Sequence, residues 1–228
     1  ARARAAGADA ADAVAVRGDS LSIAWRHGAL EHVERSEGED IGLRVLIGRR
    51  QAGASSADRS PAALDRLVER AVAMARVAPE DPTAGLAEPG QLAKTWPDLD
   101  LFDPSEPSVD DLSEMVAAAE AAMLAVPGVS ANSEGAEASW GRSALAVVAS
   151  NGFSARYQRS GSSLTAVALA GEGTGMERQY DGHSAVHRAD LEAADLIGRR
   201  AGERAVRALG ARKPKSQAVP IVFDRRIA

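Results

Sequence analysis

Cysteine is absent from this 228-residue sequence, and so is any long apolar run. Without cysteine the chain cannot form disulfides, thiolate metal sites or a cysteine nucleophile, and it suits a reducing compartment. A membrane-spanning helix needs about 20 consecutive apolar residues, and the alanine-rich start is interrupted by Arg2, Arg4, Asp9 and Asp12. We therefore expect a cytoplasmic protein that neither spans a membrane nor is secreted.

An excess of basic residues is also lacking, because 27 Lys and Arg stand against 32 Asp and Glu and the formal net charge is −5. Nucleic-acid binding needs clustered lysine and arginine to neutralise phosphates, so this composition argues against a nucleic-acid partner. The remaining composition is globular, with 45% hydrophobic and 26% charged residues. A chain of this length forms roughly one or two domains and buries a core without metal or disulfide support.

Alternation of apolar with polar or small residues predicts an antiparallel meander from Ala13 to Ser56. The alternating residues are Val14, Val16, Leu21, Ile23, Trp25, Leu43, Val45 and Ile47, with turns expected at Gly18-Asp19 and His27-Gly28. Ser60 can cap a following helix and Pro61 fits its first position. The first ten residues, rich in alanine, read as the end of a helix.

Six of the ten prolines lie between Pro79 and Pro107, which excludes a regular element there. Loops of such length are uncommon in compact domains, so this connector is either a domain boundary or a functional loop packed down by its aromatic and leucine residues. Of the two we favour a strap across the surface. After it, Ser108 and Asp111 have the spacing of a capping box for a second helix, which Pro127-Gly128 closes.

The second half repeats this kind of pattern. Strands are predicted in pieces at 145–148, 153–157 and 164–169, with Asn151-Gly152 as a hairpin turn. Asp190 is expected to cap a third helix that ends at Gly210. A shift of the chain by 124 residues places Leu21 on Leu145 and Gly28 on Gly152. The sequence therefore predicts an internal duplication.

The predicted fold class is α+β, with antiparallel sheet meanders flanked by helices and a duplicated unit of a helix, four to five strands and a helix. The strands of the two units form either one extended sheet or two packed sheets. We place the first unit at 1–78, the proline-rich connector at 79–107 and the second unit at 108–215. Residues 216–228 begin a strand, Val219–Phe223, leading into an absent C-terminal domain, because the chain lacks an initiator Met and stops soon afterwards.

Candidate chemistry is sparse, and no catalytic, cofactor-binding or metal-binding set stands out. His183 and His187 have the spacing of two zinc ligands on a helix, but they lie between strand and helix without a third ligand, so local bonding or exposure is the simpler interpretation. His27 and His32 are expected at the surface. Gly171–Gly175 is better explained as a hairpin loop than as a phosphate cradle, because the P-loop lysine and helix are missing.

The clusters of charged residues also predict no specific functional site. The basic run is interpreted as a solvated helix face rather than a nucleic-acid patch; it comprises Arg199, Arg200, Arg204, Arg207, Arg212, Lys213 and Lys215. Carboxylates without a pairing geometry are offered by Glu134, Glu137, Glu172, Glu177 and Asp181.

The order of short motifs resembles the N-terminal part of the TldD/PmbA family, also called modulators of DNA gyrase, and within it the PmbA (TldE) branch. The motifs are Gly53–Asp58 followed by Ser60-Pro61, then Asp98–Pro104, Asn132–Gly135, Ser150–Phe153, Gly175–Tyr180 and Val219–Phe223. Each motif alone is weak, but together they span essentially the whole chain in the family's order.

This resemblance implies one subunit of a cytoplasmic metallopeptidase that cuts unfolded or extended peptides. In the family the zinc-binding helix belongs to the TldD branch, so zinc is expected in a TldD-type partner and no cofactor in this chain. The implied role is a non-catalytic scaffold whose edge strands could hold a peptide by backbone hydrogen bonds. The implied partners are a TldD-type paralogue or a second copy of the chain, together with an unfolded peptide.

Two other readings stay open. The chain could be the catalytic half of a metallopeptidase whose zinc helix follows the end of this sequence, or a stand-alone peptide-binding or structural module. Nothing in these residues indicates contact with DNA or a topoisomerase.

Overall fold

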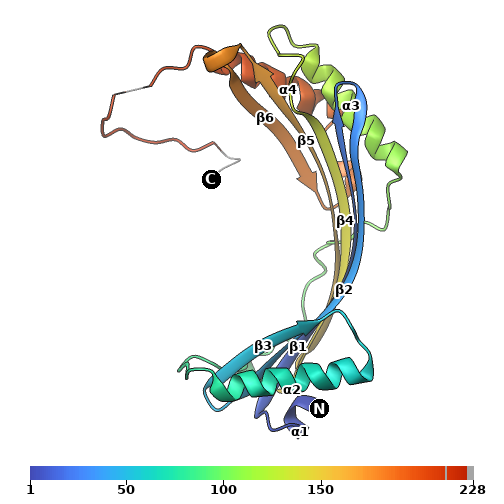
Figure 1. Cartoon of the computed structure of the whole chain (residues 1–228), viewed down its shortest axis with the longest axis vertical. Helices are drawn as coiled ribbons and strands as arrows, with labels where there is room; N and C mark the ends of the chain where they lie inside the picture. Colours follow the sequence, from blue (N-terminus) through green and yellow to red (C-terminus); the bar gives the residue numbers. More distant parts are fainter. Residues whose placement is uncertain (214, 225–228) are drawn as a thin grey trace.

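The computed structural model describes residues 1–213 and 215–224, which form one curved antiparallel sheet with helices on its outer side (Figure 1). The strands are β1 (Ala10–Arg26), β2 (Ala29–Ile47), β3 (Arg50–Ser56), β4 (Gly135–Ala149), β5 (Ser154–Ala170) and β6 (Glu177–Ala185). The helices are α1 (Arg2–Ala5), α2 (Pro61–Val77), α3 (Val109–Leu124) and α4 (Ala194–Ala208), with short 3₁₀ turns η1 (Pro89–Gln91), η2 (Gly173–Gly175) and η3 (Arg188–Asp190). The α+β fold class is confirmed.

The sheet joins the two halves of the chain. Its strand order is β3-β2-β1-β4-β5-β6, and the central pair, β1 and β4, comes from different halves. Of the two arrangements left open by the sequence, the structure therefore has one extended sheet. The division into units at 1–78, 79–107 and 108–215 stays a prediction.

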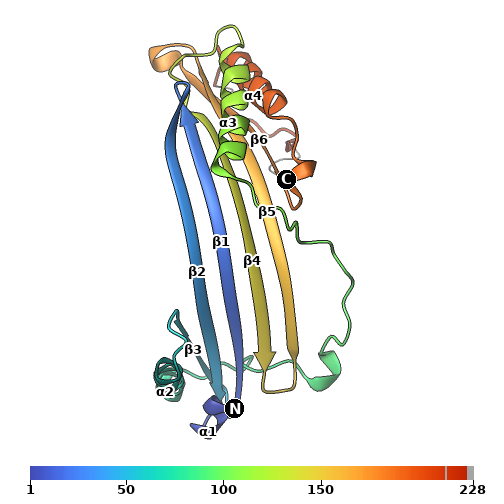
Figure 2. The same ribbon diagram turned by 90° about the vertical axis from the view of Figure 1, so that its right-hand side faces the viewer.

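Helices cover only the two ends of the convex face. At one end α3 and α4 pack on a core that includes Leu21, Ile23 and Trp140. At the other end α2 packs on a smaller core around Val45 and Val72. Figure 2 shows the strands between the two ends without a helix in front of them. We call this middle part of the sheet the waist: residues 17–20, 36–39, 141–144 and 158–161, which lie opposite one another in the register.

Two helix starts follow the sequence closely. Ser60 Oγ accepts a hydrogen bond from Ala63 N, and Pro61 occupies the first position of α2. Ser108 and Asp111 form a reciprocal capping box at the start of α3. These caps satisfy backbone N–H groups that the first helical turn leaves without partners. The predicted starts of both helices are confirmed.

Several predicted boundaries are wrong. The expected turn at Gly18-Asp19 is the middle of β1, because both residues pair with β2 on one side and β4 on the other. Likewise β5 runs unbroken through two of the predicted pieces, so each half has three strands rather than four or five. A glycine without positive φ fits an extended strand, and only tertiary pairing decides between strand and turn.

Two further predictions fail near the C-terminal end. Asp190 lies in η3 and does not cap α4, whose N-cap is Ala193 without a side-chain bond. Val219–Phe223 forms no strand in the described part of the chain, and its side chains are exposed. An extended segment needs a neighbouring strand to complete its hydrogen bonds, and no described strand pairs with this one. Residues 225–228 of the predicted strand segment lie outside the described residues.

The proposed register of the duplication is also wrong. Leu21 faces the helices and is 2% exposed, whereas its counterpart Leu145 lies five residues from the buried Trp140 in β4 and therefore faces the opposite side. Side chains alternate along a strand, so an offset that is wrong by one residue exchanges the two faces. The order of elements does repeat in the two halves, but the duplication itself stays a prediction.

A buried carboxylate fixes the β1–β2 turn. Glu120 of α3 is 4% exposed, and its two oxygens accept hydrogen bonds from His27 N at 2.7 Å and Gly28 N at 2.8 Å. Both turn residues have positive φ, 55° and 72°. The turn predicted at His27-Gly28 is therefore confirmed, and the carboxylate supplies a contact that local sequence cannot reveal.

Replacing Glu120 by alanine is expected to lower the free energy of unfolding by about 2 kcal/mol, because two backbone donors lose a charged acceptor. Glu120→Gln should give a smaller loss, since its amide retains one acceptor oxygen. Urea unfolding would measure both. Glu114→Ala, an exposed change on the same helix, is the control and should stay within a few tenths of a kcal/mol. Equal loss for Glu114 and Glu120 would contradict this account.

Candidate functional site

The concave face of the sheet is the candidate functional surface. No described helix covers it, as Figure 1 shows along the whole curve of the strands. Its side chains are those that alternate with the buried residues of the convex face: even-numbered residues in β1 and β2 up to the irregularity near Trp25, and odd-numbered residues in β4 and β5. The surface thus consists of regular rows of side chains that cross several strands.

At the waist this face is almost bare of side chains. In β1, β2 and β4 small residues occupy two adjacent rows and line a shallow hollow: Gly18, Ser20, Ser36, Gly38, Gly141 and Ser143. Arg159 of β5 is the one large side chain at the end of these rows. A third row adds Ser22, Ser139 and Ser163, with a hydroxyl contact of 2.8 Å between the last two. Small side chains allow another backbone to approach a sheet closely. The waist can therefore accommodate a chain that lies across it.

An apolar row flanks the bare waist on the side of α2. Val16, Leu145 and Tyr157 lie side by side across β1, β4 and β5, and Tyr157 is 46% exposed. Val14 and Val147 form the next row. An exposed tyrosine combines a large apolar contact area with a polar hydroxyl, so this row provides an apolar binding surface beside the hollow.

The convex face of the waist is charged and holds the connector. Arg142 binds Asp19 at 2.9 Å and Glu106 at 3.1 Å, and Arg35 also binds Glu106 at 3.0 Å. Glu106 belongs to the proline-rich connector, so ion pairs attach the connector to this face. The predicted surface strap is consistent with these contacts.

The connector also closes the edge of β5 where β6 ends. Ser160 N donates to Leu101 O at 2.9 Å, and Ser160 Oγ accepts from Asp103 N at 2.7 Å. The Asp103 carboxylate accepts from Arg188 N and Ser105 N. The hydrogen bonds from Ser105 and Arg188 lower the pKa of Asp103 to about 2. Asp103 is therefore ionised at neutral pH and joins the connector to η3.

His187 provides a second contact between the connector and η3. Its Nε2 lies 3.1 Å from Asp100 Oδ1. Partial burial acts to lower the pKa of His187, but the carboxylates of Asp100 and Asp103 together raise the pKa above its usual value of 6.5. The guanidinium of Arg188, the next residue in the chain, lies 4.0 Å from the Asp111 carboxylate.

The contact between His187 and Asp100 is expected to weaken as pH rises. A raised pKa means that the docked connector favours the protonated imidazole, so this contribution is complete below pH 6.5 and disappears as pH rises through the folded pKa. Amide exchange at Ser160, corrected for the intrinsic rate, should therefore accelerate between pH 6 and pH 8.5. His187→Gln should remove the pH dependence, and an unchanged profile in that variant would contradict the role of the imidazole.

The structure separates the other candidates found in the sequence. His183 Nδ1 accepts from Glu192 N at 3.2 Å, while His187 binds the connector, so the two rings have different partners. His27 and His32 are exposed. Gly171–Gly175 forms the β5–β6 connection as a loop with a 3₁₀ turn, which confirms the hairpin interpretation.

The interpretation of the basic run as a solvated face is only half right. Arg200 and Arg204 both bind Asp181, which is 2% exposed, and the Asp181–Arg200 distance is 2.6 Å. Arg199 does lie on the exposed side and pairs with Glu203. The spacing of four between Arg200 and Arg204 was visible in the sequence. Their buried partner, Asp181, lies on β6, a separate element that local sequence does not connect with this helix.

Metal ligands are not gathered in the part of the chain that the structure describes: no group of three or more His, Asp or Glu there could hold an ion. The resident zinc of a metallopeptidase therefore does not fit these residues. Among the helices that are described, none is long and apolar enough to cross a bilayer.

Sequence reasoning missed the bare waist, although a signal was present. Glycine and serine recur at alternate positions of β1 and β4, as in Gly18-Asp-Ser20-Leu-Ser22 and Ser139-Trp-Gly141-Arg-Ser143. This period of two indicates a strand with one face free of large side chains. Reading Gly18-Asp19 as a turn concealed it.

Two family models match the chain. One is described as the PmbA/TldA metallopeptidase domain 1 and matches residues 11–75. The other is described as the PmbA/TldA metallopeptidase central domain and matches residues 102–209. Together the models cover both halves of the sheet.

Curated relatives extend the match over nearly the whole chain. The metalloprotease PmbA of Escherichia coli O157:H7 is 32% identical over 220 residues, which cover 96% of this chain and 49% of the relative. A PmbA homologue of Haemophilus influenzae is 28% identical and covers 98% and 49%. The chain therefore spans about half the length of the curated relatives that it matches.

Solved structures share the fold. A protein of Bacteroides thetaiotaomicron named as a candidate modulator of DNA gyrase has a TM-score of 0.83 at 24% identity, covering 94% of this chain and 49% of the other. TldE of Thermococcus kodakarensis has a TM-score of 0.70 at 17% identity, covering 87% and 44%. At such identities these likenesses establish the fold alone.

Proposed function

Because the chain belongs to the PmbA/TldD metallopeptidase family, we propose that it is the substrate-holding scaffold of a two-chain peptidase and leaves the hydrolytic chemistry to a partner. The supporting observation is the concave face, which no described helix covers and which carries mostly glycine and serine at the waist. A bare sheet face leaves room for an extended chain. Main-chain hydrogen bonds at its edges would grip such a chain without reading its side chains.

In this proposal zinc belongs to a TldD-type partner, as the resemblance to the PmbA branch implies; the described residues of this chain contain no group of three or more His, Asp or Glu that could hold it. When bound there, zinc supplies an activated water at neutral pH. This chain's own residues form the wall of the chamber: the small residues of the waist allow close approach, and the row around Tyr157 provides apolar contact. Unfolded segments are preferred, since a folded protein cannot lie along a single strand edge.

The test is co-expression of the complete gene product with a zinc-bearing paralogue. We expect a stable complex that cleaves an unfolded peptide, loses activity to a chelator and regains it with zinc, while either chain alone is inactive. Failure to form a complex, together with no cleavage by the mixture, would contradict the proposal. The proposed location is the cytoplasm, which a cysteine-free chain tolerates.

A second candidate is favoured by the printed name of a relative, because the E. coli protein is itself called a metalloprotease. In that case the complete gene product would carry the zinc helix and would cleave peptide without a paralogue. Reading the codons that follow Ala228, and assaying the purified product alone, separates the two candidates.

A further inference from the structure

One edge of the sheet is open over much of its length. β2 runs from Ala29 to Ile47, but β3 pairs only with residues 41–47. In the described backbone, residues 29–40 make hydrogen-bonded pairs with β1 alone, and Figure 2 shows no element beside this part of β2. Alternate residues of an edge strand direct their N–H and C=O groups outward. At ~3.3 Å per residue, this open edge is about 40 Å long.

The other edges are shorter or occupied. The connector covers β5 at Ser160. At β6, Arg204 reaches Tyr180 O. β3 is a strand of only 7 residues, and Arg50 near its start binds Arg76 O at the end of α2. The open edge of β2 is therefore the best template in the described structure for an additional strand.

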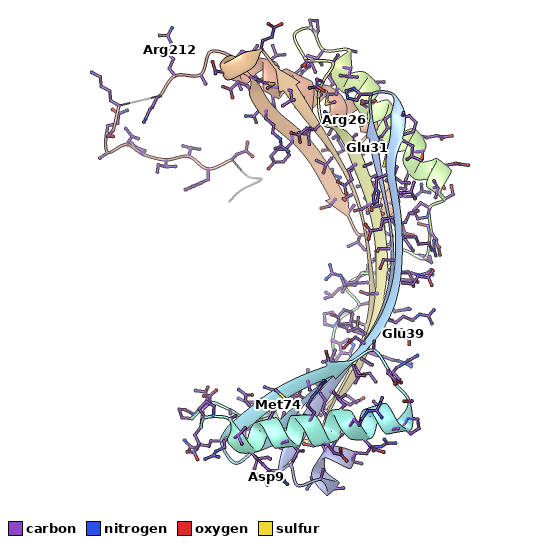
Figure 3. All side chains as sticks on the ribbon, viewed as in Figure 1. Asp9, Arg26, Glu31, Glu39, Met74 and Arg212 are labelled. Atoms are coloured by element: carbon purple, nitrogen blue, oxygen red, sulfur yellow. The ribbon has the colours of Figure 1, made fainter. Side chains whose placement is uncertain are left out.

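The open edge is strongly negatively charged. Residues 29–40 contain Glu31, Glu34, Glu37, Glu39 and Asp40 but a single arginine, Arg35. Figure 3 shows Glu31 and Glu39 toward the two ends of this stretch. Every residue of the stretch is exposed except Glu39.

The two faces of the edge differ in how this charge is balanced. On the convex face Glu37 binds Arg35 at 3.1 Å, and Glu39 binds Arg17 and Arg59. On the concave face Glu34 pairs only with His32, at 3.6 Å, among the described ion pairs. None of the described ion pairs includes Asp40. Uncompensated negative charge therefore concentrates on the concave face of the open edge.

We infer that the open edge of β2 binds an extended polypeptide segment that carries lysine or arginine at alternate positions, adding it to the sheet as a further strand. This inference rests on the proposed function and names the substrate class that the scaffold prefers. Carboxylates on an edge discourage pairing with a second copy of the same strand, because like charges would lie opposite each other. A basic strand removes that repulsion.

The spacing of the residues supports this ligand. Glu34, Ser36, Gly38 and Asp40 all lie on the concave face, and the two carboxylates are separated by about 20 Å at ~3.3 Å per residue. The small residues between them leave room for long basic side chains. The opposite face of the ligand would meet the balanced pairs of the convex face and needs no charge. A segment with basic residues on one face and neutral residues on the other fits both.

The test uses three labelled 12-residue peptides and the full chain. The first alternates lysine and threonine, the second alternates glutamate and threonine, and the third repeats the first with alternate backbone nitrogens methylated. Fluorescence anisotropy should detect binding of the first peptide only, and higher salt should weaken it. Amide exchange should slow within residues 29–40 when the first peptide is bound.

Charge variants locate the site. Glu34→Lys with Asp40→Lys should weaken binding of the lysine peptide by about tenfold, which is about 1.4 kcal/mol or about 0.7 kcal/mol for each exposed pair. Glu69→Lys with Glu114→Lys changes the net charge equally at exposed positions on α2 and α3 and should leave binding within about twofold. Equal weakening in both double variants, equal binding of the methylated peptide, or protection outside residues 29–40 would each overturn the inference.

Two outcomes separate this inference from the proposed function. If the complex with the zinc-bearing partner cleaves peptides but shows no preference for the lysine peptide, and Glu34→Lys with Asp40→Lys leaves its cleavage unchanged, the inference fails while the proposed function stands. If the lysine peptide binds to the edge but no mixture cleaves any peptide, the proposed function fails and the inference stands.

A peptide-free dimer that protects residues 29–40 would assign the edge to a second copy and overturn the inference.

Discussion

Replacing Asp181 by alanine is expected to lower the free energy of unfolding by about 4 kcal/mol, because removal of one member of a buried ionic cluster leaves the others buried without compensation. Asp181 is 2% exposed and binds both Arg200 and Arg204. These contacts attach α4 to β6. Urea unfolding followed by far-ultraviolet circular dichroism would measure the loss.

The matched control for Asp181 lies on α4, the helix that Asp181 binds. Glu203 forms an exposed pair with Arg199 at 3.9 Å, and Glu203→Ala should cost only about 0.3–0.5 kcal/mol. Asp181→Asn keeps the shape but removes the charge, and should fall near the alanine variant. If Asp181→Asn were as stable as the original chain, the charge of the carboxylate would not be what holds α4.

Gly198→Ala should be the next most damaging change, with an expected loss of about 3 kcal/mol. A Cβ atom at Gly198 would lie 1.9 Å from Ala119 O and 3.1 Å from Ala119 Cα, so α3 and α4 would have to separate. Overpacking of this kind costs about 1–3 kcal/mol or more, and exceeds the roughly 1 kcal/mol that alanine gains in helix propensity. Thermal unfolding would detect the difference as a lower Tm.

A glycine with open space provides the comparison for Gly198. No atom lies within 4 Å of a Cβ built at Gly38, so Gly38→Ala should leave the Tm unchanged or slightly higher. A stable Gly198→Ala chain would mean that the two helices can shift apart without loss. The close approach of α3 and α4 would then not contribute to stability.

Features that depend on neighbours in the sequence were predictable. Ser60-Pro61 and the Ser108–Asp111 box start helices because capping involves residues three apart. His27-Gly28 and Asn151-Gly152 turn the chain because glycine accepts positive φ, which is 72° at Gly28 and 95° at Gly152. These signals also supported the α+β fold class.

Features that depend on distant contacts were not predictable. Gly18-Asp19 carries the composition of a turn, yet two flanking strands keep it extended. Arg200 and Arg204 belong to a basic run that is typical of a solvent-exposed helix face, yet the buried Asp181 binds both. For the candidate site, the sequence indicated that strand edges could hold a peptide but did not identify an edge. The mismatch in length between β2 and β3 became visible only with the register.

The absence of described helices from the waist has a mechanical consequence. The cores at the two ends of the sheet are joined by four long strands, β1, β2, β4 and β5, and by the connector. A single layer of strands bends far more easily than two packed layers. The sheet should therefore bend at the waist, while its two ends, where helices pack on it, stay rigid. A strand added along β2 would widen this single layer at the waist and make it harder to bend, so occupancy of the edge would influence the distance between the two ends of the sheet.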